Sequence, residues 1–298
     1  MRRILLAVLL LLVSAIPAFA AGSVRVAYAG SRGVVMDRHL GPAFAKTNDV
    51  IYQGIGQGSY ALARLIAGRQ LEADVFVAIT PGPAMVLLKA GLIAQAVPVA
   101  STAMVIAYSP KSRFARTFAG GEAWWRVLES PGLRFGRTDP STDPQGRNII
   151  FTMLLAERYY HQPDLAARIL GPVVNHAQIF AEASILSRLE AGQLDASSAY
   201  QSAAISHRLP FVRLPDEINL SDPAMEQDWY GTVHFSIPEP NGKSRRAHTE
   251  PLVFYAAVLK DAPHPMLARK LVAFLSSPAG QALFGRSGYG PPKGGPIR

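Results

Sequence analysis

A seven-residue pattern that occurs twice constrains the fold of this chain more than any other feature. Leu62-x-Arg-Leu-x-Ala-Gly68 and Leu186-x-Arg-Leu-x-Ala-Gly192 have identical spacing and lie about 124 residues apart. Each copy indicates a helix ended by glycine, and each leads within a few residues into a short apolar segment, at 73–78 and at 196–200. Two such helix-to-strand units predict two lobes built on similar βαβ plans.

Further segments continue this alternation of strands and helices. We expect strands at 24–29, 102–108, 133–137 and 252–258, and helices at 60–67, behind a capping Ser59, and at 145–160. Pro265 and Pro278 occupy positions typical of the first turn of two terminal helices. Because strands alternate with helices, the predicted fold class is α/β, with a mainly parallel sheet in each lobe.

Two crossovers are expected to connect the lobes. Residues 102–108 lead from the first lobe to the second, and residues 211–214 lead back. The predicted first lobe therefore consists of residues 21–104 together with 214–298, and the second lobe of residues 105–213.

The first twenty residues have the order of a cleavable signal peptide. Arg2 and Arg3 precede the apolar run Ile4–Val13, and Ala18-Phe19-Ala20 supplies small residues for cleavage. Ser14 and Pro17 interrupt the run well before the roughly 20 apolar residues that a membrane span needs. We therefore expect removal of residues 1–20 and export to the periplasm. The chain has no cysteine, so we expect neither a lipid-bearing N-terminal cysteine nor disulfides.

The charge of the chain is compatible with an anionic ligand. Lys and Arg number 30 against 21 Asp and Glu, and removal of Arg2 and Arg3 lowers the formal net charge from +9 to +7. The basic residues are dispersed, and export removes the protein from nucleic acid, which is therefore not an expected partner. The one basic cluster, Lys243–Arg246, is expected to be a solvated loop inside the Pro- and Gly-rich segment 238–251.

Motifs of enzymes are missing from the sequence. There is no Gly-x-Ser-x-Gly, Ser-x-x-Lys, His-Glu-x-x-His or P-loop motif, and the seven histidines have no metal-ligand spacing. Trp124 and Trp125 are expected to pack locally rather than to stack on a ligand. No catalytic residue, metal site or cofactor is therefore predicted, and binding without chemistry is the favoured activity.

Three turns could present hydrogen-bond donors to an oxyanion. They are Gly30-Ser31, Gly56–Ser59 and Asp139–Gly146, and each lies between an extended segment and a predicted helix. Free amides and the positive dipole end of a helix N-terminus stabilise anions, and ligands gather where strand C-termini meet helix N-termini. An alternative role for Ser59 and for Asp143, which precedes Pro144, is helix capping, and capping is compatible with ligand contact.

Several stretches resemble substrate-binding proteins of molybdate/tungstate ABC transporters, in particular the branch typified by archaeal tungstate-binding proteins. These stretches are spread over most of the expected mature chain, and the last of them is the most specific. They are Tyr28–Ser31, Gly136–Gly146, Leu155–Tyr160, Leu189–Asp195, Tyr200–Ser202 with His207, and Leu214–Pro223.

This resemblance implies a hinged two-lobe periplasmic binding protein of type II, acting as a monomer that delivers an oxyanion to an inner-membrane permease. Ser31 and Ser59, with Gly30 and Gly58, would donate from the first lobe. The second lobe would contribute Asp143, Tyr200 and Ser202, and in this branch two carboxylates can complete six-coordination of the metal centre.

Three positions depart from the pattern of that family. Ala199 replaces the usual Glu before Tyr200, Gln201 replaces a frequent Lys, and Ile79-Thr80-Pro81 replaces an Ala-Asp pair. A bare Asp143 carboxylate beside a dianion would repel it by about 4 kcal/mol per unit of ligand charge at 4 Å and an effective dielectric constant near 20. Asp143 therefore ligates the metal, or caps its helix and faces away, or the ligand is different.

The sequence predicts a periplasmic protein that captures molybdate or tungstate for an ABC transporter. The alternative within this class is another oxyanion or a small organic anion. Alternatives from other classes are a secreted enzyme or a sensor subunit on the same fold.

Overall fold

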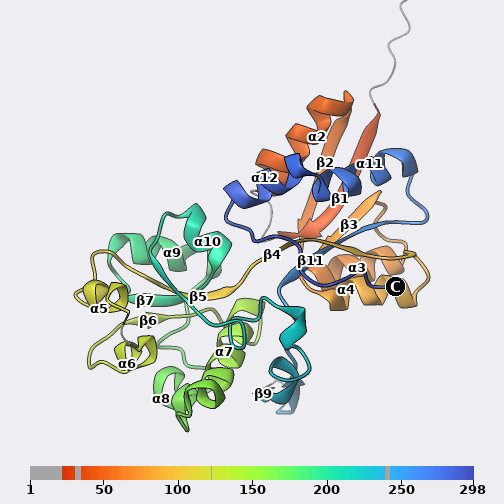
Figure 1. Cartoon of the computed structure of the whole chain (residues 1–298). Helices are drawn as coiled ribbons and strands as arrows, with labels where there is room; N and C mark the ends of the chain where they lie inside the picture. The colour runs from red at the N-terminus through yellow and green to blue at the C-terminus, as the bar shows by residue number, and fades with distance from the viewer. Residues whose placement is uncertain (1–21, 31–34, 122, 239–241) are drawn as a thin grey trace, which may run out of the picture.

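The computed structural model describes residues 22–30, 35–121, 123–238 and 242–298 of the chain, in which two sheets flanked by helices form two lobes (Figure 1). The predicted signal peptide and Ser31 lie outside these residues. In the described part no helix is long and apolar enough to cross a membrane.

The first lobe is a five-stranded sheet in the order β2-β1-β3-β11-β4. Its strands are β1 (Ser23–Ala29), β2 (Ile51–Gln57), β3 (Val75–Ala78), β4 (Val97–Ser101) and β11 (Val253–Val258). One face carries α2 (Gly41–Asn48), which follows a π-helical turn (Met36–Leu40), together with α11 (Pro265–Ser276) and α12 (Pro278–Arg286). The other face carries α3 (Ser59–Ala67) and α4 (Pro81–Lys89).

The second lobe is a four-stranded sheet in the order β6-β7-β5-β8. Its strands are β5 (Met104–Tyr108), β6 (Phe135–Gly136), β7 (Ala196–Tyr200) and β8 (Phe211–Arg213). The helices on one face are α5 (Ala115–Ala119), α6 (Trp124–Leu128), α7 (Pro144–Tyr160) and α8 (Leu165–Leu170). The other face carries α9 (Glu182–Ala191) and α10 (Gln201–Ser206).

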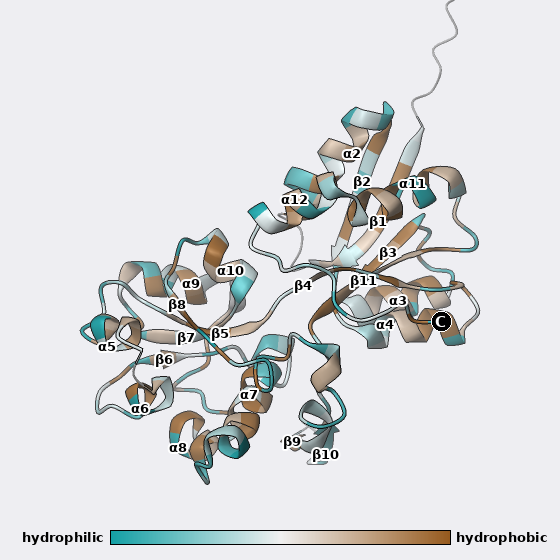
Figure 2. Cartoon of the chain, in the orientation of Figure 1, coloured by the Kyte–Doolittle hydropathy of each residue, from teal (hydrophilic) through white to brown (hydrophobic). Residues whose placement is uncertain are grey.

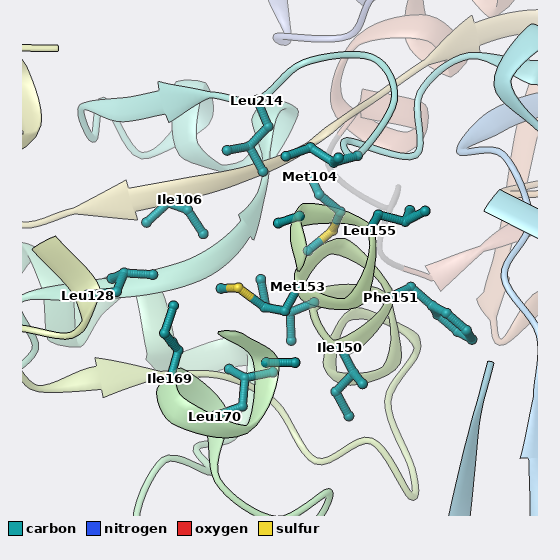
Figure 3. Close-up of a cluster of buried hydrophobic side chains, with 14 of the residues drawn as sticks. Met104, Ile106, Leu128, Ile150, Phe151, Met153, Leu155, Ile169, Leu170 and Leu214 are labelled. Carbon is teal, nitrogen blue, oxygen red and sulfur yellow. The ribbon is translucent and has the colours of Figure 1, made fainter. Parts of the chain in front are cut away.

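Alternation of side chains along the central strands divides each lobe into two cores. On β5, Met104 and Ile106 pack toward α7, whereas Val105 and Ala107 pack toward α9. Figure 3 shows Met104 and Ile106 with the side chains of α7 and α8 in the larger core. Because both faces are covered, β3 and β11 consist mainly of apolar residues, as their brown colour in Figure 2 shows, whereas β7 also contains the buried Ser197 and Ser198.

The repeated pattern forms equivalent units in the two lobes, as predicted. Helices α3 and α9 each end at a glycine cap and lead into a central strand, β3 or β7. A buried aspartate precedes each strand: Asp74 accepts a hydrogen bond from the backbone N–H of Arg25 at 2.8 Å, and Asp195 accepts one from that of Arg134 at 2.9 Å. Each carboxylate thereby ties its strand to the neighbouring parallel segment.

The α/β two-lobe fold agrees with the prediction, but the sheets are not mainly parallel. Among the described strands, β1 pairs in parallel with β2 and β3, and β6 pairs in parallel with β7. The four ladders of these two sheets that involve β11 and β5 are antiparallel. The reason is that β5 and β11 arrive directly from the opposite lobe rather than through a helical crossover within their own sheet.

The chain passes between the sheets at two places. Only Thr102 and Ala103 separate β4 from β5, and the chain re-enters the first sheet at β11. Strand β8, the predicted return, still belongs to the second sheet. Buried side chains after it pack in the core around α7, at Leu214, Ile218, Leu220, Tyr230, Ile237, Ala247 and Leu252. These contacts favour a return of the chain to the first lobe near Leu252. The exact limits of the two lobes stay a prediction.

Part of the predicted basic loop is a strand. Residues of β10 (Ser244–Ala247) pair antiparallel with β9 (Phe235–Pro238), and we call this pair the β9–β10 ribbon. Two short 3₁₀ turns, Pro223–Met225 and Tyr230–Thr232, precede it. The loop prediction was wrong because the partner strand compensates for the weak strand propensity of a charged segment.

The tryptophan pair packs locally, as predicted. The rings of Trp125 and Tyr160 stack with centroids 3.8 Å apart. Trp124 donates its indole N–H to the Tyr160 hydroxyl at 3.2 Å. Both contacts join α6 to the end of α7.

Candidate ligand-binding cleft

A cavity of about 320 Å³ lies between the two lobes. Its lining residues are Ala29, Gly30, Gln57, Gly58, Ser59 and Ile79 of the first lobe and Asp143, Pro144 and Tyr200 of the second. Every wall is thus formed where a strand ends or a helix begins, which is where open α/β sheets hold their ligands.

The first-lobe wall is built from the ends of two parallel strands. The register of β1 and β2 places Ala29 opposite Gln57, and Gly30 and Gly58 follow these residues. Gly58 is the N-cap of α3, and no side chain caps this helix. A β-carbon at Gly58 would meet no atom within 4 Å, so the site is open there. The first amides of α3 are therefore available to an anion.

Ser59 does not precede α3 as a cap, which corrects the expectation from sequence. It is the first residue of the helix, because the carbonyl of Gly58 already accepts the N–H of Leu62 at 3.0 Å. The Ser59 hydroxyl is buried and accepts the backbone N–H of Ile79 at 3.4 Å. That long bond leaves the hydroxyl proton to be directed elsewhere.

The second-lobe wall begins at the N-terminus of α7. Asp143 is its N-cap, and its carboxylate accepts the N–H of Gln145 at 2.7 Å. Pro144 occupies the first helical position, so the predicted cap and first-turn pair is confirmed. Burial raises the pKa of Asp143 above its ordinary value, although the bond from Gln145 opposes this shift. One carboxylate therefore caps α7 and lines the cavity at the same time.

Tyr200 completes this wall at the end of β7. It is 4% exposed, and its hydroxyl accepts the side-chain amide of Asn148 at 3.1 Å. Asn148 lies on the second turn of α7. This bond couples the orientation of the Tyr200 ring to the helix that carries Asp143.

Five of the seven predicted ligand residues line this one cavity: Gly30, Gly58, Ser59, Asp143 and Tyr200. Ser202 lies apart from it, where its hydroxyl accepts a hydrogen bond from Thr102 at 3.2 Å beside the crossover between the lobes. The seventh, Ser31, lies outside the described residues.

Arg147 was not among the predicted site residues, yet it lies directly behind the cavity wall. It is half-buried on α7, and its Nη1 donates to the carbonyl of Pro140 at 3.1 Å. Burial, with the nearby charge of Arg245, lowers the pKa of Arg147, whereas Asp143 and Tyr200 raise it. Its place in the first turn of a helix behind an Asp-Pro cap was the available signal in the sequence.

The family's second carboxylate has no equivalent at residue 199. Ala199 is fully buried in the apolar core shared with α9 and α10, and the following residue, Tyr200, faces the cleft. In the described residues no group of three or more His, Cys, Asp or Glu side chains could hold a metal ion.

Two α/β lobes joined by short crossovers, with helix N-termini on both sides of the intervening cavity, define a two-lobe binding protein. The model of the bacterial extracellular solute-binding proteins matches residues 24–290, and the chain belongs to this family.

Curated relatives include proteins that are named for their ligands. The molybdate/tungstate-binding protein WtpA of Thermococcus kodakarensis is 32% identical over 205 residues, which cover 62% of this chain and 57% of the relative. A putative ABC transporter molybdenum-binding protein of Haloferax volcanii is also 32% identical, over 61% of this chain and 57% of the relative. The alignments thus span less than two thirds of the length of these relatives.

Solved structures have the same fold at low sequence identity. The substrate-binding domain of a putative molybdenum ABC transporter from Clostridium difficile superposes with a TM-score of 0.62 at 14% identity, over 92% of this chain and all of that one. Iron-bound HitA from Pseudomonas aeruginosa gives 0.57 at 18% identity, over 91% of this chain and 87% of that one. Since these two proteins are named for different metals, the fold alone does not specify the ligand.

Proposed function

We propose that this protein captures molybdate or tungstate as a tetrahedral oxyanion in the cavity between its lobes and delivers it to the permease of an ABC transporter. The observation that carries the proposal is the convergence of the uncapped N-terminus of α3 and the N-terminus of α7 on one cavity. The curated relatives that are named for molybdate and tungstate support this choice of anion.

The proposed contacts divide between the lobes. The amides at Gly30 and Gly58 and the hydroxyls of Ser31 and Ser59 would donate from the first lobe, and Tyr200 would contribute from the second. Closure of the lobes would remove water from the anion and strengthen each of these hydrogen bonds. Ser202 would act at the crossover, through its bond with Thr102, rather than on the ligand.

The remaining elements of the proposal concern the export of the protein, its oligomeric state and its lack of catalytic activity. Residues 1–20 would direct export to the periplasm and be removed, and the mature protein would act as a monomer without cofactor or catalytic activity. Membership in an extracellular solute-binding family supports the export.

Thermal unfolding with added anions tests this function. A ligand at 100 times its dissociation constant should stabilise the fold by about 2.7 kcal/mol. We expect a large upward shift of the melting temperature with molybdate and tungstate and a smaller one with sulfate and phosphate. Shifts with sulfate or phosphate alone would favour a different oxyanion, and no shift with any of the four would contradict the function.

Asp143→Asn separates the roles that the sequence left open for this carboxylate. We propose that Asp143 caps α7 without ligating the metal, since its oxygen is bonded to Gln145 and Ala199 provides no second carboxylate. Asparagine caps a helix about as well as aspartate. We therefore expect D143N to bind tungstate at least about 10-fold more tightly at neutral pH by calorimetry, because a like charge near the anion is removed.

The pH dependence gives a second readout for this variant. The folded-state pKa of Asp143 is raised, so ionised Asp143 costs stability above that pKa, and the cost vanishes below the unfolded value. The difference in tungstate affinity between D143N and the wild type should therefore shrink as the pH falls through the raised pKa. Below that pKa the Asp143 carboxyl of the wild type is already neutral. A loss of affinity of about 10-fold or more would instead indicate direct ligation of the metal.

A further inference from the structure

A positively charged side chain, Arg147, lies beside the cavity and is bonded to the turn before α7. Arg147 is the fourth residue of the helix, and its guanidinium bonds back to Pro140 in the turn that carries Asp143. Asp143 and Tyr200, which line the cavity, are close enough for their charges to act on Arg147. A charge at this position therefore also acts on an anion inside the cavity.

The β9–β10 ribbon brings a second arginine, Arg245, close to Arg147. Its register pairs Arg245 with Ile237, and Ala247 with Phe235. Alternate residues of a strand share a face, so Arg245 lies on the face where Ile237 and Ala247 are buried in the core of the second lobe. Arg246 lies on the opposite face.

A ring contact anchors this face of the ribbon to α7. The rings of Phe235 and Phe151 lie 4.9 Å apart, and Phe151 is one helical turn after Arg147. The charge of Arg245 lowers the pKa of Arg147, in agreement with this arrangement of the ribbon beside α7. Segments about 100 residues apart in the sequence thus bring two positive charges near each other, and one of them, Arg147, acts directly on Asp143.

We propose that Arg147 and Arg245 set the charge preference of the cleft, so that it selects a divalent tetrahedral oxyanion over a monovalent one of the same shape. This inference rests on the proposed function and concerns the same cavity. Hydroxyl and amide donors fix the positions of the four oxygens, whereas full positive charges act over a longer range and add an energy proportional to the charge of the ligand. The arginines thereby offset part of the like charge of Asp143.

Tungstate and perrhenate provide the test, because both are tetrahedral tetraoxo anions with charges of −2 and −1. Calorimetry should compare R147Q, R245Q and the control R246Q; both ribbon arginines are exposed, and Arg246 lies on the opposite face of β10, where it pairs with Ser236. One lost charge on the order of 10 Å away should weaken binding by about 10-fold per unit of ligand charge. We therefore expect R147Q to lose about 100-fold in affinity for tungstate and about 10-fold for perrhenate. R245Q should lose less affinity for each anion, again with the larger loss for tungstate. R246Q should bind both anions as the wild type does.

The conservative variant R147K distinguishes charge from support of the turn. Lysine keeps the positive charge but not the guanidinium bond to Pro140, so R147K should recover most of the tungstate preference. Equal losses for both anions in R147Q, or unchanged binding in both R147Q and R245Q, would overturn the inference while leaving the proposed function intact. Failure of the wild-type protein to bind tungstate would overturn both.

Discussion

A G146A variant is expected to lose both stability and anion binding. A β-carbon at Gly146 would lie 2.3 Å from the carbonyl oxygen of Thr138 and 2.8 Å from backbone atoms of Asp139 and Pro140. Because these are backbone atoms, the clash is relieved only when the turn before α7 moves away from the helix. That turn carries Asp143, so the second-lobe wall of the cleft moves with it.

The expected loss of stability in G146A is about 1–3 kcal/mol, as for other overpacked sites, measured by urea denaturation. The affinity for tungstate should fall at least about 10-fold in the same protein, because the contacts of the cleft need accurate positioning.

Gly285→Ala is the matched control for this substitution. Gly285 lies in α12, where an added β-carbon meets no atom within 4 Å. Alanine is the better helix former by about 1 kcal/mol, so G285A should be as stable as the wild type or more stable, with unchanged binding. If G146A were equally stable, the close approach of the turn to α7 would be contradicted.

Asp195→Ala is expected to be the most destabilising change of a single charged residue. Asp195 is 4% exposed, and its carboxylate joins three segments of the second lobe. It accepts the backbone N–H of Arg134 at 2.9 Å, the guanidinium of Arg134 at 2.9 and 3.1 Å, and the hydroxyl of Ser112 at 2.8 Å.

Removing this carboxylate leaves the donors of two segments, at Ser112 and Arg134, without their acceptor. Loss of one partner of a buried pair costs about 3–5 kcal/mol, and we expect about 2–4 kcal/mol here because the Arg134 side chain is 53% exposed and can be hydrated. Urea denaturation should show this decrease with an unchanged slope. The exposed Asp261, replaced by Ala, should change stability by less than about 0.5 kcal/mol.

The pH dependence of stability gives an independent check on Asp195. Burial alone would raise its pKa, but the bonds from Arg134 and Ser112 hold the pKa below the ordinary value of an aspartate. Its contribution is therefore fully present above the ordinary pKa and is lost as pH falls through the depressed value. Below pH 4 the stability of D195A should decline less steeply than that of the wild type, and parallel curves would contradict this role.

Elements with strong local signals could be predicted from the sequence. The Asp143-Pro144 pair starts α7 as expected, and Pro265 and Pro278 start α11 and α12. Capping and the fixed φ of proline act within one helical turn, so these starts depend on few distant contacts. The repeated helix-to-strand unit belongs to the same class, because its glycine end and apolar strand are adjacent in the chain.

Other features could not be predicted because they depend on partners far away in the sequence. Long-range ladders and burial decide the antiparallel entry of β11, the pairing of β10 with β9, and the packing of Leu214–Ile237 and Ala247–Leu252 in the second lobe. The start of α3 at Ser59 rather than after it depends on the strand end that delivers Gly58.

The candidate site shows the same division between features set by local sequence and features set by long-range contacts. The sequence by itself determined the kinds of group available, namely the glycine turns, Ser59, Asp143 and Tyr200, and the capping that orients α7. Only the tertiary structure decided that five of the predicted residues share one cavity, that Ser202 lies at the crossover, and that the charge of Arg245 acts on Arg147. Local signals act over one turn of chain, whereas a cleft between lobes exists only after the strand ends of two separate sheets, more than 100 residues apart in the sequence, face each other.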